Sequence, residues 1–475
     1  MRKSILALLS LLVVVSLFLT ACGSAPTEEP VATEEPTEAA TEEPATEEPT
    51  EEATEAPAEE VELSIWVMPN GADPQAAIDA EIAAFNELYP NIKVTAEIVG
   101  WGDAYGRIQT ALQSGEGPCI TQLGTTWVPT FGTMGGMHVF TEEEIAALGG
   151  EENFVPASWS TASIEGSTVA VPWFADVRAI AYRADLFEDL GIDPDVAFAD
   201  LDSFIEALET IKEAAPTNAD GTAIAPFLHP GRNDWNVWQN ASGWIWAYGG
   251  ELLNEDGTEA IFNSPEAVAG ITRFNGLYAL GLTPEDTLEL NSSQADARFG
   301  EGTVATYMTG PWIISNARDV ETSGWVPEAA EGLAFAAFPA GPGGQYTFIG
   351  GSNLGVMDSC ANPDEAFEFV KYLLGKESQI RYANAVGMLP STMDGQTDPI
   401  FTEDPLFSVF IDAAVNGKTS NNIAAWGQVE NNLQTAIQGL WEDVAGLGIG
   451  TAVEQSTVQE RLDEAVETVN TLLAQ

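Results

Sequence analysis

The sequence predicts an α/β protein of two lobes that are joined by crossing strands, with a ligand cleft between them. Its 475 residues exceed what one hydrophobic core usually supports. A strand, a helix and a second strand follow one another within residues 61–99, which indicates a parallel sheet. The strand-like stretch 171–183 carries Asp176 and Arg178 among apolar residues. Strand interiors seldom hold charges unless these face each other, solvent or a ligand, so we interpret this stretch as a crossing over a polar cleft. An edge strand with a surface ion pair is the alternative.

The first 22 residues are predicted to be an export signal. Arg2 and Lys3 precede an apolar run from Ile5 to Leu19, which is too short for a comfortable membrane span. The sequence Leu19-Thr20-Ala21-Cys22 resembles the bacterial lipobox, which implies that Cys22 is diacylated. An ordinary signal peptide with an incidental cysteine is the alternative. The resemblance therefore predicts an exported protein that is lipid-anchored to the outer face of the bacterial cytoplasmic membrane.

Residues 23–60 are predicted to be a disordered spacer. They repeat Thr-Glu-Glu-Pro with alanine between, and they contain no aromatic residue and no base. Such a segment cannot bury enough apolar surface to offset the entropy lost on ordering. Proline and the repulsion between glutamates favour an extended chain that lifts the folded part off the membrane.

The charge balance excludes several classes of partner. Sixteen basic and 73 acidic residues give a formal charge of −57, which argues against nucleic acid and against anionic lipid. Apart from Cys22, the chain has only Cys119 and Cys360. Because paired cysteines outside the cytoplasm are more often bridged than free, we expect a disulfide, although the spacing does not place the two together.

The folded part, from residue 61 on, alternates strands with helices. Helices are expected in chain order at 74–89, 105–113, 201–214, 267–280, 364–374, 377–384, 426–440 and 458–473. In open α/β sheets, ligands bind beyond the carboxyl ends of the strands. Asn70, Asp73 and Trp127 follow predicted strands and are expected at that rim. The turn and strand 350–356 is read as a place where a ligand approaches bare backbone.

A concentration of tryptophans lies at residues 235–246. Trp235, Trp238, Trp244 and Trp246 fall within twelve residues, beside Asn236, Gln239, Asn240 and Ser242. Helical spacing alone is equally compatible with a core. The polar neighbours favour a wet face that contacts a ligand.

We find no catalytic constellation, no metal site and no cofactor motif. The two histidines, His138 and His229, lack metal-ligand spacing, and nucleophile-elbow, P-loop and HExxH motifs are absent. What remains is a set of tryptophans at predicted loop tips with a few amides and isolated charges. Flat indole faces complement the apolar faces of sugar rings, and carboxylates and amides bind hydroxyls. A phosphate ligand would instead require clustered arginines or lysines, which this chain lacks.

The order of motifs resembles the extracellular solute-binding proteins of ABC transporters, in the sugar-binding group that includes maltose-binding protein. The similarity runs from about Leu63 to Leu473. It rests on residues 63–66, 117–127, 171–183, 310–312, 350–353 and 425–426. The resemblance implies a periplasmic-binding-protein-like fold that closes on its ligand by a hinge. It implies a monomer without enzymatic activity that delivers a carbohydrate, an oligosaccharide, to membrane permease subunits.

The resemblance also suggests boundaries and binding residues. The first lobe is expected at 61–175 and 333–362, and the second at 176–332 and 363–475. Trp312 and Trp426 match sugar-stacking aromatics, Trp244 or Trp246 a third, and Asp176 a hydroxyl-binding acid. The expected ligand-binding set is Asn70, Asp73, Trp127, Asp176, Arg178, Trp244, Trp246, Trp312, Gly351, Ser352, Asn353 and Trp426. Cys119 stands where the group usually has aspartate; a bridge to Cys360 is sensible if the two strand ends are adjacent.

Two other functions stay open from the sequence. The same transport role could serve a polyamine, a peptide or a polyol phosphate, and the acid-rich composition keeps the polyamine open. A secreted glycoside hydrolase would share an aromatic cleft, since acid pairs are too numerous to exclude one by counting.

Overall fold

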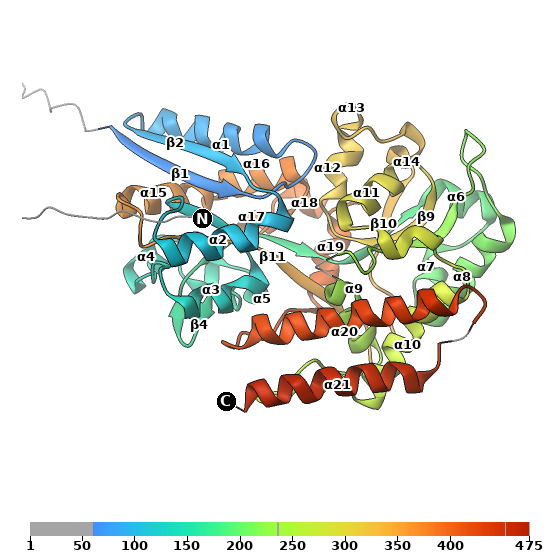
Figure 1. Cartoon of the computed structure of the whole chain (residues 1–475). Helices are drawn as coiled ribbons and strands as arrows, with labels where there is room; N and C mark the ends of the chain where they lie inside the picture. Colours follow the sequence, from blue (N-terminus) through green and yellow to red (C-terminus); the bar gives the residue numbers. More distant parts are fainter. Residues whose placement is uncertain (1–59, 235–236, 452, 475) are drawn as a thin grey trace, which may run out of the picture. The chain divides into compact units, whose positions relative to one another are not determined.

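The computed structural model describes residues 60–234, 237–451 and 453–474. The predicted signal, Cys22, the spacer up to residue 59, and Trp235 and Asn236 lie outside the described residues. Among those described, two β-sheets are surrounded by helices (Figure 1). No helix of this part combines the length and apolar character needed to span a membrane.

The first sheet has seven strands and is mixed. Its hydrogen-bonded order is β12-β6-β11-β3-β1-β2, and β13 pairs with β11. β1 pairs with β2 and β3 in parallel, whereas β11 runs antiparallel to β3 and β6. The strands are β1 Val61–Val67, β2 Ile92–Ile98, β3 Ile120–Gly124, β6 Val171–Val177, β11 Thr347–Val356, β12 Leu389–Pro390 and β13 Gly417–Lys418. The expected parallel βαβ unit at the start of the folded part is therefore confirmed.

The second sheet has four strands in the order β10-β7-β9-β8. β7 is antiparallel to both neighbours, and β8 runs parallel to β9. The strands are β7 Ala179–Arg183, β8 Ala225–Leu228, β9 Val304–Thr309 and β10 Leu333–Ala336. The short strands β4 Ser163–Ile164 and β5 Ser167–Thr168 form a separate hairpin.

Helices cover both sheets. Those before β10 are α1 Pro74–Leu88, α2 Trp101–Ser114, α3 Val128–Met134, α4 Glu142–Ala147, α5 Pro156–Trp159, α6 Ala184–Leu190, α7 Pro194–Ala197, α8 Leu201–Ala214, α9 Val237–Ala247, α10 Pro265–Ala279, α11 Ser292–Gly300, α12 Ile313–Arg318, α13 Val320–Ser323 and α14 Pro327–Glu331. Those after it are α15 Pro363–Leu373, α16 Lys376–Val386, α17 Met393–Gln396, α18 Pro399–Thr402, α19 Ser408–Ala414, α20 Trp426–Leu447 and α21 Gln455–Leu473. Single 3₁₀ turns are η1 Thr125–Trp127, η2 Glu151–Asn153 and η3 Glu285–Glu289.

The chain passes from the first sheet to the second at Arg178. β6 ends at Val177 in the seven-stranded sheet, and β7 begins at Ala179 in the four-stranded sheet. A second passage runs from β10 to β11 through residues 337–346. The backbone N–H of Arg178 donates to Phe348 O at 3.0 Å, and Thr347 Oγ1 donates to Arg178 O at 2.7 Å. These bonds tie the two passages together, so residues 171–183 form the crossing that the sequence predicts.

The arrangement differs from the expected lobe boundaries in two places. β10 belongs to the four-stranded sheet, although 333–362 was assigned to the first lobe. α15 and α16 pack in the core of the seven-stranded sheet, although 363–475 was assigned to the second. Phe369 of α15 lies against Phe85 of α1, with ring centroids 4.8 Å apart. An amphipathic pattern shows which helix face is buried but does not name the sheet that buries it.

The C-terminal helices belong to the largest cluster of the hydrophobic core. α9 is buried on every side and packs with α10, α20 and α21 in one large cluster. α20 contacts α3 and η1 as well as α9 and α10. This helix therefore packs against elements beside both sheets (Figure 1). Cys119, just before β3, forms a disulfide with Cys360, just after β11. Neighbouring antiparallel strands bring these two positions together.

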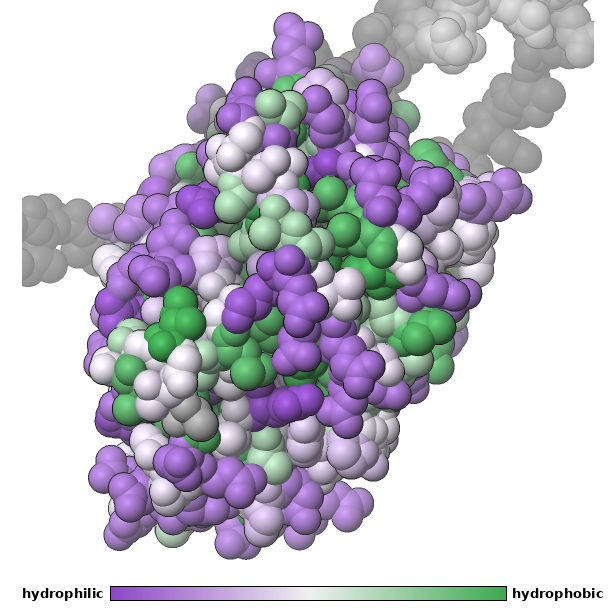
Figure 2. All heavy atoms as spheres, turned by 90° about the vertical axis from the view of Figure 1, so that its right-hand side faces the viewer, coloured by the Kyte–Doolittle hydropathy of each residue, from purple (hydrophilic) through white to green (hydrophobic). Residues whose placement is uncertain are grey.

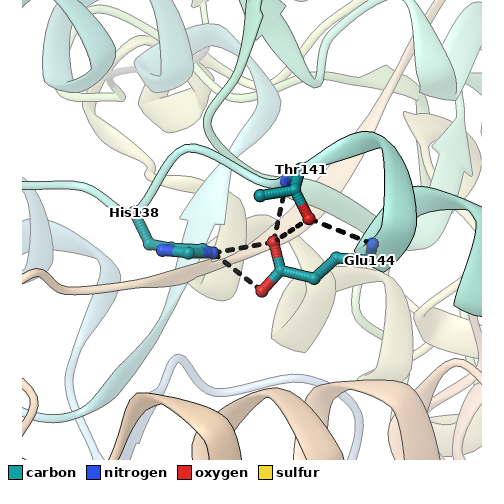
Figure 3. A network of polar contacts seen from close by, with 3 residues as sticks. All are labelled: His138, Thr141 and Glu144. Atoms are coloured by element: carbon teal, nitrogen blue, oxygen red, sulfur yellow. Dashed lines mark hydrogen bonds and ion pairs between the residues drawn. The ribbon is translucent and has the colours of Figure 1, made fainter.

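The surface is mainly polar, as a chain with 73 acidic residues requires. Figure 2 shows hydrophilic residues over most of one face, with hydrophobic residues confined to small areas. Local polar networks fix short helices: Figure 3 shows His138, Thr141 and Glu144 at the start of α4. Thr141 Oγ1 accepts from the Glu144 N–H at 3.2 Å, and Glu144 Oε2 accepts from the Thr141 N–H at 2.7 Å. This reciprocal pair is a capping box.

Candidate ligand-binding site

A cleft of about 680 Å³ lies where the two sheets meet. Loops 69–72, 100–102 and 124–126 line one wall, and they follow the carboxyl ends of the parallel strands β1, β2 and β3. Residues of α9 and α11 and the segment after β9 line the other wall. The volume suits a small ligand, and the position obeys the rule for open α/β sheets.

Arg178 occupies the floor of the cleft at the crossing. Its side chain is only 4% exposed, and Nη2 donates to Gln239 Oε1 at 2.8 Å. The guanidinium carbon lies 4.6 Å from the ring centroid of Trp312, a cation–π distance. The crossing residue therefore contacts two groups of the second wall and shares the cleft with both.

Trp312 is held on the second wall by three neighbours. β9 ends at Thr309, and Trp312 follows after Gly310 and Pro311. Its Nε1 donates to Asp296 Oδ2 at 3.0 Å. A Cβ at Gly310 would stand 1.9 Å from Trp312 Cζ3, so only glycine lets the indole lie there. With Arg178 over its ring, the indole is fixed before any ligand arrives.

Trp101 presents a second indole from the opposite wall. It stands at the start of α2, directly after the end of β2, and its Nε1 donates to Pro69 O at 3.0 Å. Trp127 packs behind it, with ring centroids 5.6 Å apart and an interplanar angle of 68°. Trp325 also lines the cleft. The two walls thus carry aromatic faces on opposite sides of one space.

Three aspartates line the cleft: Asp176, Asp234 and Asp296. Burial raises the pKa of Asp296 to about 7, although hydrogen bonds from Tyr307 and Trp312 oppose this. Tyr307 OH donates to Asp296 Oδ1 at 2.8 Å. Burial also raises the pKa of Asp176, and the charge of Arg178 opposes that shift. These environments make ionised carboxylates costly in the absence of a ligand.

Bare backbone lines the cleft along β11. Gly351 has a φ of +133°, and a Cβ there would lie 2.1 Å from Phe174 O. The register between β11 and β6 shifts between Ser352 and Asn353, which marks a β-bulge. Ser352 Oγ accepts from Gln122 Nε2 at 2.8 Å. Gly351 and Ser352, on the two sides of this irregularity, both line the cleft.

The structure brings half of the expected binding residues together. Those that line the cleft are Asn70, Asp176, Arg178, Trp312, Gly351 and Ser352. Asn70 is 2% exposed, and its Nδ2 donates to Gln122 Oε1 and to Tyr382 OH, both at 3.2 Å. Their contact with a ligand stays a prediction.

Three expected tryptophans belong to the core instead. Trp244 and Trp426 are 0% exposed and Trp246 is 2% exposed. Trp244 stacks on Phe274 at a centroid distance of 5.2 Å, and Trp426 meets Trp238 edge-on at 5.5 Å. α9 is enclosed by α10 and α20, so these tryptophans do not face a ligand, although Gln239 of the same helix does line the cleft. The placement of these three at the ligand rim is wrong in this structure.

The remaining three expected residues have structural contacts that keep them out of the cleft lining. Asp73 Oδ1 accepts from Ala76 N at 3.0 Å and caps α1. Trp127 is 4% exposed and supports Trp101. Asn353 is 0% exposed, and its Nδ2 donates to Thr161 Oγ1 at 3.0 Å. The strand-end rule located the right loops but not the side chains that face inward.

Sequence reasoning missed several residues of the cleft. Trp101 follows β2 directly, so the rule that selected Asn70 would also have selected it. Asp234 and Asp296 come from a loop and a helix whose facing directions depend on packing. No local pattern distinguishes them from the other polar residues of an acid-rich chain.

Neither histidine belongs to the site. His229 is buried between Trp441 and Phe274, and burial lowers its pKa to about 4. His138 pairs with Glu144 at the surface. Within the described residues, no group of three or more His, Cys, Asp or Glu side chains could hold a metal ion.

The family model for bacterial extracellular solute-binding proteins matches residues 69–380. The chain belongs to this family. The matched range includes both passages between the sheets and every residue that lines the cleft, with the exception of Met388.

Relatives of this solute-binding protein agree with that assignment. The diacetylchitobiose-binding protein DasA of Streptomyces coelicolor is 28% identical over 382 residues, which cover 78% of this chain and 82% of DasA. The maltose-bound MalE3 of T. maritima superposes with a TM-score of 0.72 at 23% identity, covering 86% of this chain and 100% of MalE3. The GacH receptor of Streptomyces glaucescens, solved with and without acarbose, gives 0.72 at 20% identity, covering 87% and 99%. These structures share the fold of the solute-binding protein, which confirms the predicted two-lobed α/β class.

Proposed function

We propose that this solute-binding protein captures a carbohydrate, an oligosaccharide, in the cleft and delivers it to the permease of an ABC importer. The observation that carries the proposal is the pair of indoles, Trp101 and Trp312, on opposite walls, with carboxylates and amides between them. Indole faces cover the apolar faces of sugar rings, and the polar groups bind hydroxyls. The ligands named for DasA and GacH are saccharides or saccharide analogues, which supports the same class here.

Export and anchoring through a lipid on Cys22 complete the proposal, with residues 23–60 as the spacer to the membrane. A diacylated cysteine gives durable attachment, because two acyl chains hold where one does not. Lobe closure would bend the two passages, at Arg178 and within residues 337–346, where the backbone crosses between the sheets.

The cleft is proposed to bind without catalysis, as a monomer. Glycoside hydrolysis needs a carboxylic acid that is free to protonate the leaving oxygen. Both oxygens of Asp296 instead accept hydrogen bonds, from Tyr307 and from Trp312, and Asp234 Oδ2 accepts from the Ser292 N–H and Oγ. Asp176 is then left without a second free carboxyl group to form the pair that hydrolysis needs. Incubation with the tightest-binding oligosaccharide should leave it intact, and release of shorter sugars on chromatography would contradict this part.

Replacing Trp312 with alanine tests the site. The change should raise the Kd of the oligosaccharide by about 5- to 150-fold, equivalent to about 1–3 kcal/mol, since an aromatic anchor is lost. The Kd is measured by titrating the oligosaccharide into a protein of residues 60–475 and following its tryptophan fluorescence. Trp159→Ala is the control, because Trp159 stacks on Phe154 away from the cleft. Equal affinities for Trp312→Ala and the unaltered protein would refute the assignment.

A further inference from the structure

A buried carboxyl group, that of Glu430 in α20, contacts elements of both cleft walls without lining the cleft. Its Oε1 accepts from Trp238 Nε1 of α9 at 3.0 Å, and the Thr126 hydroxyl of η1 hydrogen-bonds the same carboxyl group. Thr126 lines the first wall, and Gln239, the neighbour of Trp238, lines the second. One side chain therefore joins η1 of the first wall to α9 of the second.

The packing of α20 holds this carboxyl group between the walls. The helix contacts α9 and α10, and it also contacts α3 and η1. Gly427, three residues before Glu430, permits the close approach to α3, because a Cβ there would lie 2.3 Å from Thr130 Oγ1. Trp426, at the start of the same helix, meets Trp238 edge-on with ring centroids 5.5 Å apart. The carboxyl group therefore stands in a tightly packed contact of three elements.

In the described part of the chain, no charged side chain compensates Glu430. Burial raises its pKa to about 7, and the hydrogen bonds from Thr126 and Trp238 oppose this shift only in part. The titratable group that faces it is Tyr105 of α2, whose own pKa is raised by burial and by the charge of Glu430. A buried carboxyl group without a cation is costly, and groups of this kind gather at functional sites.

We propose that Glu430 is a positioning residue for the ligand, which holds η1 and α9 at the separation that the bound ligand needs and does not itself contact the ligand. The inference rests on the proposed function, because the ligand is the sugar that the two walls enclose. Gln239 next to Trp238 also accepts from Arg178 at the crossing, at 2.8 Å. The contact made by Glu430 is thereby continuous with the floor of the cleft.

The proposal predicts how ligand affinity depends on pH. When the walls separate, the carboxyl group loses its partners and reaches water, where an ordinary glutamate pKa is about 4.3. The arrangement with facing walls therefore keeps a proton that the separated arrangement releases. Affinity should fall as pH rises from about 4.3 to about 7, and it should level off above that range.

The test compares Glu430→Gln and Glu430→Ala with the unaltered protein, with maltotriose and diacetylchitobiose as probes. Glutamine keeps the shape and the acceptor but does not titrate, so its Kd should equal that of the unaltered protein at pH 5 and be about threefold lower or less at pH 8. Alanine leaves Trp238 Nε1 without this acceptor, so its Kd should rise by about tenfold at both pH values.

Two further measurements isolate Glu430. Burial also raises the pKa of Asp296 to about 7, but Asp296 is present in every variant, so the ratio of each Kd to that of the unaltered protein removes its contribution. Glu442→Gln is the control, because Glu442 is exposed on the same helix, and its ratio should be one at both pH values.

The separation of the walls can be measured without a ligand. Spin labels are attached to cysteines that replace Ala80 of α1, which packs on β2, and Glu209 of α8, which packs on β8; both positions are exposed. Pulsed electron paramagnetic resonance then gives the distribution of distances between the labels. Glu430→Ala should broaden this distribution, whereas Glu430→Gln should leave it unchanged.

The outcomes separate this inference from the proposed function. Unchanged Kd values for Glu430→Ala overturn the inference and leave carbohydrate binding intact. Equal weakening by alanine and glutamine at both pH values also overturns it, since that result indicates packing alone. Absence of binding by any sugar overturns the proposed function, and the label distances then decide by themselves whether Glu430 holds the walls together.

Discussion

Gly351 adopts a backbone conformation that other residues reach only with strain. Its φ of +133° lies in the region that favours glycine, and a Cβ would approach Phe174 O to 2.1 Å. The atom in the way is backbone in the neighbouring strand, which cannot swing aside. The sequence marked 350–356 as a place for bare backbone, and the structure supplies the steric reason.

Gly351→Ala should lower the free energy of unfolding by about 2 kcal/mol or more, because both strain and a clash are introduced. Urea unfolding followed by circular dichroism measures the change. Gly106→Ala in α2 is the matched control: nothing lies within 4 Å of its Cβ position, so that helix should gain up to about 1 kcal/mol. Equal unfolding midpoints for the Gly351 variant and the unaltered protein would contradict the account.

The tryptophans show how far single residues can be interpreted. Trp312 follows the carboxyl end of a strand, and ligands in open α/β sheets bind beyond these ends. Its place in the cleft could therefore be predicted. Trp244 and Trp246 lie in a helix, and a helix buried on every side carries no sign of which residues face a ligand. Of their polar neighbours, Ser242 is accommodated inside the core, where it donates to Gln239 O at 2.8 Å, whereas the Gln239 side chain lines the cleft.

At the scale of elements, short helices depend on their caps. α4 is six residues long and contains no buried residue, so packing contributes little to it. The capping box of Thr141 and Glu144 satisfies N–H groups at its start, and His138 Nε2 lies 2.9 Å from Glu144 Oε1 (Figure 3). Burial raises the pKa of Glu144, but hydrogen bonds from Thr141 and His138 outweigh this and lower it overall.

Thr141→Ala should lower the free energy of unfolding by about 1 kcal/mol at pH 7. Because the folded pKa of Glu144 is depressed, its contribution is present above the unfolded value of about 4.3 and is lost as pH falls through the folded value. The difference between variant and unaltered protein should therefore shrink in acid. Thr110→Ala is the control, since Thr110 bonds only to a carbonyl of its own helix. A constant difference from pH 7 to pH 3 would contradict the role of Glu144.

The βαβ unit shows which features of helices and strands can be predicted from the sequence. Strand alternation and helical periodicity placed β1, α1 and β2 within a residue or two of their observed bounds. The amphipathic helices α15 and α16 could also be predicted, but the sheet against which they pack could not. Glu81 of α1 fixes α16 through Arg381 and through Ser378 Oγ at 2.7 Å, a contact 297 residues apart in sequence.

At the scale of the whole molecule, the disulfide joins residues that are 241 positions apart. Cys119 precedes β3 and Cys360 follows β11, so the bridge ties the first half of the seven-stranded sheet to the strand that returns from the crossing. A cross-link over so long a segment restricts the unfolded chain strongly in the entropic account.

Replacing both Cys119 and Cys360 with serine should lower the free energy of unfolding by about 2–5 kcal/mol. Denaturant unfolding with and without reductant measures it. The unaltered protein should lose stability in reductant, whereas the double variant should not respond. Identical unfolding of the unaltered protein in both conditions would show that the bridge does not contribute.

The α/β class, the parallel unit, the crossing at 171–183 and loops of the cleft could be predicted from the sequence alone. They follow from periodicity, from strand ends and from the two charges in an apolar stretch, which are local properties of the chain. Which side chains face inward depends on tertiary packing: Asp234 and Asp296 line the cleft, and Trp244, Trp246 and Trp426 lie in the core. The direction of a helical side chain depends on what encloses its helix, and that enclosure is built from segments hundreds of residues away.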